Sequence, residues 1–214
     1  MAGAAALRNS VDAREGAPPP CAMERTTPRL PELLVGLRVT LRRWRADDVP
    51  ALSDVVEHNV EHLRPFMAWA ADEPMGSRER VELIESWDRS WRDGGDVGLG
   101  VFAGGRIIGG CGLHRRRGPH GLEIGYWVDK DHLRQGVGTE VGRLLTAAAL
   151  AVPDVTFVEI RHDKANVASA GIPRRLGYEF VGEVPGDRTA PARVGIDCVW
   201  RMQAVDWPDG RETM

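Results

Sequence analysis

Apolar and polar residues recur along this chain with two different periods, and the stretch from 123 to 152 contains both of them. Its first six residues, EIGYWV, are rich in β-branched and aromatic side chains and predict a buried strand. After a turn with two glycines, apolar residues recur at the spacing of one helical face, at Val141, Leu144, Leu145 and Ala148. The stretch therefore predicts a strand, a glycine turn and a helix in direct succession.

The same patterns predict the other elements. The expected strands are 35–44, 97–103, 106–113, 155–161, 178–184 and 194–202, and the other expected helices are 47–56, 59–70, 77–93 and 163–177. The Gly104-Gly105 hairpin makes neighbouring strands antiparallel, whereas the helix between 123–128 and 155–161 requires a right-handed crossover with parallel strands. We expect an α/β fold with a mixed, mostly antiparallel sheet, one parallel pair and helices on both faces. Divergence of the parallel pair at the glycine turn would leave a cleft for an extended ligand.

Composition indicates one folded domain between two tails. Residues 1–27 are rich in Ala, Pro, Arg and polar residues without an apolar period, which predicts a disordered N-terminal extension. We expect residues 28–209 to form a single domain, and residues 210–214 to be a tail.

The overall charge and the cysteines narrow the class of protein. The chain has 28 Lys and Arg against 31 Asp and Glu, a formal net charge of −3, so neither nucleic acid nor an anionic membrane is expected as a partner. The sequence shows no run of 18 apolar residues and no secretory signal. Cys21, Cys111 and Cys198 have no paired spacing, which favours reduced thiols and a cytoplasmic location.

The glycine turn, LRQGVGT at 133–139, is the first candidate for chemistry. A helix start exposes backbone N–H groups and the positive end of the helix dipole, which suits a phosphate or pyrophosphate. A Cβ at Gly136 or Gly138 would hold such an anion away from the backbone. The turn is not a P-loop, which ends in Gly-Lys-Ser/Thr, and it lacks the third glycine of a dinucleotide-binding fingerprint. From these residues alone, an ordinary strand–helix turn is the alternative.

Four segments together resemble the GNAT superfamily of acyl-CoA-dependent N-acyltransferases. They are NVEHLRPFMAWA from Asn59, GLEIGYWVDKDHLRQGVGTE from Gly121, NVASAGIPRRLGYEFVG from Asn166, and Val199-Trp200-Arg201-Met202 with Asp206-Trp207. The sequence is most similar to the RimJ/RimL-like branch, named for enzymes that acetylate the N-termini of ribosomal proteins, over residues 30–207. The resemblance implies a GNAT fold, acetyl-CoA or another acyl-CoA as cosubstrate, no metal, and a homodimer by family habit.

The resemblance also implies a set of cosubstrate-binding residues. The pyrophosphate loop corresponds to Arg134, Gln135, Gly136, Val137, Gly138 and Thr139, and the strand that pairs with pantetheine corresponds to Tyr126, Trp127 and Val128. Leu133 departs from the Gln or Arg usual at the first loop position, which should matter little because backbone N–H groups hold the pyrophosphate. Asn166 is expected to hydrogen-bond the pantetheine arm; the alternative is that it only caps a helix.

Transfer of an acyl group from a thioester needs a neutral amine, a stabilised oxyanion and a thiolate that can leave. At pH 7, deprotonation costs about 1.4 kcal/mol for an α-amine of pKa ~8 and about 4.6 kcal/mol for a lysine of pKa ~10.4. A weak base acting through water therefore suffices for an α-amine, and Glu123 is the candidate. The alternative for Glu123 is an exposed strand carboxylate. A backbone N–H near Val128 would stabilise the oxyanion.

The proton donor for the thiolate is not the usual one. Many GNAT enzymes have a Tyr seven residues after the Asn, and here that position is Pro173. Ser169 is the expected replacement; the alternative is a serine on the helix surface.

Phe66 and Trp69 could wall the acceptor pocket or belong to the core. The basic loop from Arg115 to Arg117 is expected to be a solvated turn; alternatively, it is a rim that attracts the phosphates of a ligand. The acceptor is either a protein N-terminus or a small-molecule amine. Two alternatives remain: transfer from a larger donor such as succinyl-CoA, which basic residues near the acyl group would favour, and a non-catalytic acyl-CoA-binding module.

Overall fold

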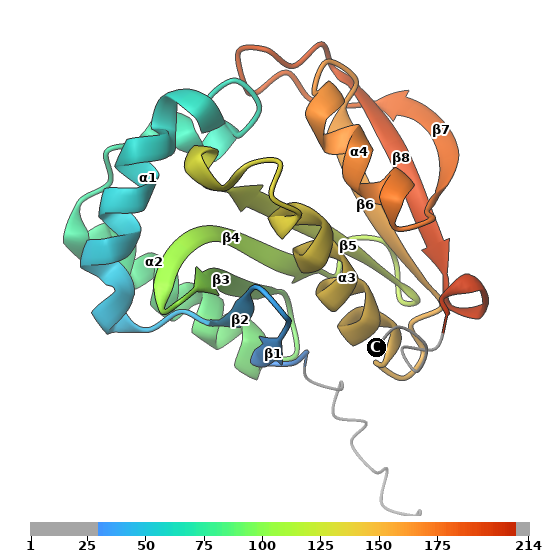
Figure 1. Cartoon of the computed structure of the whole chain (residues 1–214), viewed down its shortest axis with the longest axis horizontal. Coiled ribbons are helices and arrows are strands. Elements are labelled where there is room, and N and C mark those ends of the chain that lie inside the picture. Colours follow the sequence, from blue (N-terminus) through green and yellow to red (C-terminus); the bar gives the residue numbers. More distant parts are fainter. Residues whose placement is uncertain (1–29, 209–214) are drawn as a thin grey trace, which may run out of the picture.

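In the computed structural model, which describes residues 30–208, a curved sheet of eight strands lies between two layers of helices (Figure 1). The strands are β1 (Leu33–Val35), β2 (Thr40–Arg43), β3 (Val97–Ala103), β4 (Arg106–His114), β5 (Gly121–Val128), β6 (Phe157–Asp163), β7 (Glu179–Pro185) and β8 (Ile196–Gln203). The helices are α1 (Val49–Leu63), α2 (Ser77–Arg92), α3 (Val137–Leu150) and α4 (Val167–Arg175). The predicted extension at 1–27 and the tail at 210–214 lie outside the described residues.

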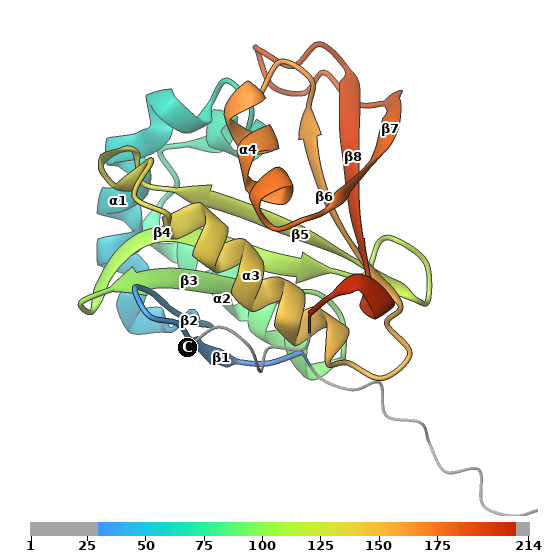
Figure 2. The same cartoon turned by 45° about the vertical axis from the view of Figure 1, so that its right-hand side comes forward.

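The sheet order is β1-β2-β3-β4-β5-β6-β8-β7. Every neighbouring pair is antiparallel except β5 and β6, which run parallel on either side of the α3 crossover. Figure 2 shows α3 and α4 on one face of the sheet and α1 and α2 on the other. The expected mixed α/β fold with one parallel pair is confirmed.

Three predicted elements differ from the structure. The expected strand 35–44 is the hairpin of β1 and β2, closed by a bond from the Gly36 N–H to the Val39 carbonyl (2.8 Å). The prediction missed the turn because the alternation of side chains continues across it. The helices expected at 47–56 and 59–70 are instead one helix, α1, followed by a 3₁₀ turn at Ala68–Asp72. The buried face of α1 continues at helical spacing through Val56, Asn59 and Leu63, so the helix does not break where the prediction placed its end.

The core has two parts, one on each face of the sheet. The larger part packs β5 and β6 against α3 and includes Ile124, Val141 and Leu145, of which the last two are completely buried. The smaller part packs α1 and α2 against the other face, and Trp127 lies against it. Successive residues of a strand point to opposite faces, so β5 directs Ile124 toward α3 and Trp127 toward α1.

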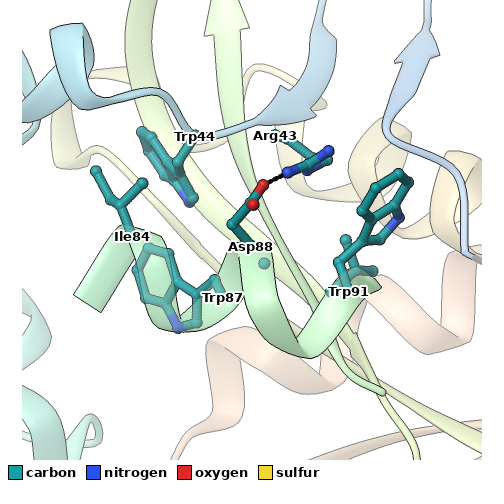
Figure 3. Close-up of a pocket in the computed structure, with 8 residues that line it drawn as sticks. Arg43, Trp44, Ile84, Trp87, Asp88 and Trp91 are labelled. Atoms are coloured by element: carbon teal, nitrogen blue, oxygen red, sulfur yellow. Dashed lines mark ion pairs between the residues drawn. The ribbon is translucent and has the colours of Figure 1, made fainter. Parts of the chain in front are cut away.

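Two cavities lie away from the parallel pair. The first, about 10 Å³ between α2 and the strands β2 and β3, is lined by Trp44, Trp87 and Trp91, and an ion pair of Arg43 with Asp88 crosses it (Figure 3). It has room for about one water molecule. The second, about 320 Å³, adjoins the β1–β2 and β3–β4 turns. Neither cavity is lined by residues of β5, β6 or α4. Among residues 30–208, no helix is both long enough and apolar enough to cross a membrane.

Folding lowers the pKa of several carboxyl groups. Burial alone would raise the pKa of Asp48 and Glu159, but the hydrogen bonds from Arg42 to Asp48, and from Arg201 and Arg161 to Glu159, outweigh it. For Asp163, backbone hydrogen bonds, including those from Ala165 and Gly195, likewise outweigh burial and lower the pKa.

We therefore predict that acid destabilises the fold. In the pH range between the lowered folded pKa and the ordinary unfolded pKa of about 4, the unfolded chain binds protons that the folded chain does not. The stabilisation is fully present above the unfolded pKa and is lost as pH falls through the folded values. Urea denaturation should give the same free energy of unfolding at pH 7 and 5, and a steady decline at pH 4 and 3. A loss already between pH 7 and 5 would contradict this and point to histidines.

Candidate active site

The parallel pair separates in the middle of the sheet. β5 and β6 are paired only from Gly121–Phe157 to Ile124–Ile160, after which β6 continues alongside β8. β5 continues to Val128 alongside β4 alone. Figure 2 shows the two strands diverging. The backbone of residues 125–128 therefore has a strand on one side only, and its other edge can pair with an extended ligand.

The glycine turn follows directly at the end of β5. Gly136 is the N-cap of α3 in the left-handed conformation (φ 84°), and no side chain caps the helix. The first intrahelical bond in α3 runs from the Glu140 N–H to the Gly136 carbonyl (3.0 Å). The N–H groups of residues 137–139 thus have no partner within the helix and are suited to an anion. A Cβ on Gly136 would meet no atom within 4 Å, so the space beside Gly136 is open.

The two glycines of the turn have different physical roles. A Cβ on Gly138 would lie 2.7 Å from Cδ1 of Ile172 on α4, and one on Gly142 would lie 2.8 Å from Cδ1 of Leu176. The sequence-based reason for Gly138, that a Cβ would hold the anion away, is therefore corrected. Gly138 allows α3 and α4 to pack closely, which brings Asn166 and Ser169 on α4 toward the cleft.

Contacts from two distant segments hold the loop in place. Asn59, which is completely buried in α1, donates to Oδ1 of Asp129 (2.8 Å) and accepts from the Lys130 N–H (2.7 Å). Arg38, in the β1–β2 turn, donates to the Gln135 carbonyl (3.2 Å), and its backbone N–H donates to Glu140 (2.9 Å). The sequence analysis assigned no role to Asn59 or Arg38. A polar residue on the buried stripe of a helix was the available signal for Asn59.

The start of α4 faces the same region. Asn166 is the N-cap of α4, and its side chain accepts from the Ser169 N–H (3.3 Å). Both side chains are partly buried. Pro173 lies within α4, which ends two residues later at Arg175. Arg175 donates to Oγ1 of Thr139 in the first turn of α3 (3.1 Å) and so adds a positive charge beside the loop, which the sequence analysis also missed.

Tyr126 lies on the part of β5 that has no β6 partner. Its hydroxyl group is buried and has no hydrogen-bond partner among the described residues. Burial, and to a smaller extent the neighbouring Tyr178, raises its pKa. A buried hydroxyl without a partner is unusual and is a ready contact for a bound ligand.

The predicted aromatic residues lie on the face of the sheet that α1 covers. The ring of Trp69 lies 6.1 Å from that of Trp127 on β5, and 37% of Trp69 is exposed. Phe66 is partly buried in the turn after α1. The loop between β7 and β8 reaches this turn, where the Ala192 N–H donates to the Pro65 carbonyl (2.9 Å). Trp69 therefore lies at the surface beside β5, and the β7–β8 loop borders Phe66.

Glu123 is not the exposed strand carboxylate that the alternative interpretation described, because it is only 7% exposed. Oε1 accepts from Arg116 (2.5 Å), and Oε2 accepts from Arg117 (2.5 Å). The basic loop is thus folded onto β5 and is not simply a solvated turn. To receive a proton, Glu123 would have to exchange a guanidinium contact for the donor.

Among residues 30–208, one group of side chains has ligand atoms close enough to hold a metal ion. His58, Asp129 and Asp131 have one ligand atom each within 4.8 Å of the others. Both oxygens of Asp129 already accept hydrogen bonds, from Asn59 and from His132 (2.8 Å each), and Nζ of Lys130 lies nearby on the His58 carbonyl (2.7 Å). These contacts tie the loop to α1, and the prediction of a metal-free enzyme stays a prediction.

Comparison with known proteins agrees with this geometry. Residues 38–179 match the family model described as an acetyltransferase (GNAT) domain. Over 145 residues, the chain is 25% identical to the protein named "Putative ribosomal N-acetyltransferase YdaF" of Bacillus subtilis (strain 168), covering 67% of this chain and 79% of that protein.

Solved structures with a similar fold include RimL and MccE. RimL, a ribosomal L7/L12 α-N-protein acetyltransferase in complex with coenzyme A, superimposes with a TM-score of 0.74 at 18% identity, covering 83% of this chain and all of RimL. The microcin C7 self-immunity acetyltransferase MccE, in complex with acetyl-CoA and AMP, superimposes with a TM-score of 0.72 at 16% identity, covering 78% of this chain and 93% of MccE. The family match spans both the diverging strands and the uncapped start of α3, and the chain belongs to the GNAT acetyltransferase family.

Proposed function

We propose that this protein is an N-acetyltransferase that transfers the acetyl group of acetyl-CoA to a primary amine by direct attack in a ternary complex. The observation that carries the proposal is the opening between β5 and β6, with the uncapped start of α3 at its mouth. The CoA pyrophosphate would bind the backbone of residues 134–139. Pantetheine would pair with Tyr126–Val128 as a substitute strand and would accept a hydrogen bond from Asn166.

The chemistry follows from this placement. The neutral amine attacks the thioester carbon, a backbone N–H near Val128 stabilises the oxyanion, and the C–S bond then breaks. Glu123 takes the proton lost by the amine through water, and Ser169 passes a proton to the leaving thiolate. Phe66 and Trp69 border the acceptor. In this assignment the proton leaving the amine and the proton reaching the thiolate are handled by two separate residues, Glu123 on β5 and Ser169 on α4.

We propose a protein N-terminal α-amine as the acceptor and a small-molecule amine as the alternative. The name of YdaF and the description of RimL support an N-terminal acceptor and the RimJ/RimL-like branch. The proposed enzyme is cytoplasmic, acts as a homodimer, and has no nucleic-acid, membrane or metal partner. The net charge of −3 supports the lack of a nucleic-acid partner.

Thermal unfolding with acetyl-CoA, free CoA and NAD, together with acceptor-dependent thiol release, tests the proposal. A ligand at about 100 times its Kd adds about 2.7 kcal/mol, or several degrees in Tm. We expect shifts with both CoA compounds and none with NAD. Gly136→Ala should abolish the shifts, since its Cβ would enter the open space in front of the α3 start. Gly105→Ala is the matched control, because it has a similar φ (80° against 84°) and also meets no atom within 4 Å. A Tm that no CoA compound moves, with no thiol release, would refute the proposal.

Replacing Glu123 by Gln should lower kcat by about 10²-fold or more and remove the acidic limb of the pH–rate profile, because general-base catalysis contributes on this scale. Glu85→Gln, which changes an exposed carboxylate on α2, is the control. An unchanged profile with full kcat would leave Glu123 with a role only in holding Arg116 and Arg117.

Replacing Ser169 by Ala should lower kcat and leave the KM for acetyl-CoA nearly unchanged, because the hydroxyl acts on the leaving thiolate and not on binding. Ser169→Thr keeps a hydroxyl and should retain most of the rate. Full kcat in the alanine variant, measured by release of free CoA thiol, would show that Ser169 is only part of the helix surface.

A further inference from the structure

A row of charged side chains crosses the sheet beside the cleft. Glu123 on β5 is in register with Glu159 on β6, and Glu159 is in register with Arg201 on β8. In-register neighbours point to the same face, and this face is opposite to that of Ile124, so the row points away from α3. On that side α1 packs against β4 and α2 against β3, and neither helix extends over β6 or β8.

Four arginines surround the two carboxylates of this row. We call Arg116, Arg117, Arg161 and Arg201 the arginine cluster. Glu159 accepts from Arg201 on Oε1 (2.5 Å) and from Arg161 on Oε2 (2.7 Å). Glu123 accepts from Arg116 and Arg117, as described above, and Arg117 also lies 3.6 Å from Oε2 of Glu159.

The carboxylates lie underneath and the guanidinium groups lie outside. Glu159 is 1% exposed and Glu123 is 7% exposed, whereas the side chains of Arg116 and Arg201 are 56% and 33% exposed. Burial by itself would raise the pKa of Glu159, but Arg201 and Arg161 reverse this and lower it, so the glutamate remains charged and keeps both arginines in place. A ligand approaching this face therefore meets guanidinium groups before it meets carboxylates.

The arginines retain hydrogen-bonding capacity toward the outside. A guanidinium has five N–H donors, and the ion pairs with Glu123 and Glu159 use only the Nε and Nη2 atoms of the cluster. Within the described residues, the Nη1 group of each of the four arginines is left for a ligand. Glu179 lies beside Arg201 on β7, and Asp96 is close enough to Arg116 for this arginine to help lower its pKa, so the four arginines are matched by four carboxylates. Fixed guanidinium groups are well suited to binding a carboxylate.

The cluster lies at the reacting end of the cosubstrate if the proposed function is correct, and the inference rests on that function. The α3 start, which would hold the pyrophosphate, follows Val128, so pantetheine would run back along β5 toward Ile124. Ile124 is the last residue of β5 paired with β6, and Glu123 immediately precedes it. The acyl group would therefore emerge next to the row of Glu123 and Glu159.

We propose that the arginine cluster binds a carboxylate beside the thioester carbon. An acceptor supplies this group as an acidic side chain next to its N-terminal amine. A dicarboxylic acyl donor such as succinyl-CoA would present the same chemistry from the other side, and the two sources are separated by experiment.

Equilibrium binding measures the site without any turnover. The probes are N-acetylated, C-terminally amidated Ser-Asp-Ala and Ser-Asn-Ala, which differ by a single carboxylate, titrated calorimetrically into the full-length protein with saturating CoA. We expect the Asp peptide to bind about fivefold more tightly or better, and the preference to shrink when NaCl rises from about 50 to about 500 mM. The donor arm compares the Kd of succinyl-CoA with that of acetyl-CoA.

Substitutions separate ligand binding from a purely structural ion-pair network. Arg116→Gln and Arg201→Gln should each bring the Asp/Asn ratio close to one, whereas Arg116→Lys should keep most of the preference. Arg78→Gln is the matched control: Arg78 is an exposed arginine (91%) with one carboxylate partner, Glu82, on α2. A structural role alone would lower the Tm of the glutamine variants and leave the ratio unchanged, which would overturn the proposal.

The comparison of succinyl-CoA with acetyl-CoA and the thiol-release assay distinguish the remaining possibilities. Equal binding of the two peptides, with succinyl-CoA preferred over acetyl-CoA in the wild type but not in Arg116→Gln, supports the site and assigns its carboxylate to the donor. No carboxylate preference in either arm refutes the inference. Because binding needs no catalysis, a carboxylate preference without acceptor-dependent thiol release would refute the proposed function alone, and thiol release without a preference would refute this inference alone.

Discussion

Hydrogen bonding between β5 and β6 stops after Ile124 and Ile160, and the candidate site depends on this interruption. Backbone N–H and C=O groups need partners, and in most sheets neighbouring strands supply them along their whole length. Here β6 continues with β8 and β5 continues with β4, so neither strand can close the opening. The opening therefore lies inside the sheet and not at its edge, with structure on both sides to hold its width.

The parallel arrangement also places the uncapped start of α3. Parallel neighbours require a crossover connection, and the helix of this crossover, α3, begins just after the free end of β5. The opened strand and the exposed N–H groups of the helix are thus consequences of one topology. The contacts of Asn59 with Asp129 and Lys130 connect α1 on the opposite face to the same loop, so that both faces of the sheet position it.

The buried glutamates on β5 and β6 have an energetic cost. Removing a carboxylate from water is unfavourable, and a buried ion pair is often no more stabilising than an apolar pair of similar size. Glu159 is 1% exposed and Glu123 is 7% exposed. The next residues of the same strands, Ile160 and Ile124, are apolar and point to the opposite face. What the charged residues contribute is orientation, because each carboxylate holds two guanidinium groups in a fixed position beside the part of the face that α1 and α2 do not cover.

The sequence by itself determined the fold class, the parallel pair, the glycine turn at the start of α3 and the cap at Asn166, because these depend on local periodicity and on residues close together in the chain. It did not reveal the β1–β2 turn, since side-chain alternation runs through the reversal. The reason for Gly138 required the position of Ile172, on another helix. Only the tertiary structure brought Asn59 to the loop before α3 and Arg117, Arg161 and Arg201 to two buried glutamates. Strand register joins residues far apart in the chain, such as Glu159 and Arg201, and no local pattern in the sequence records that register.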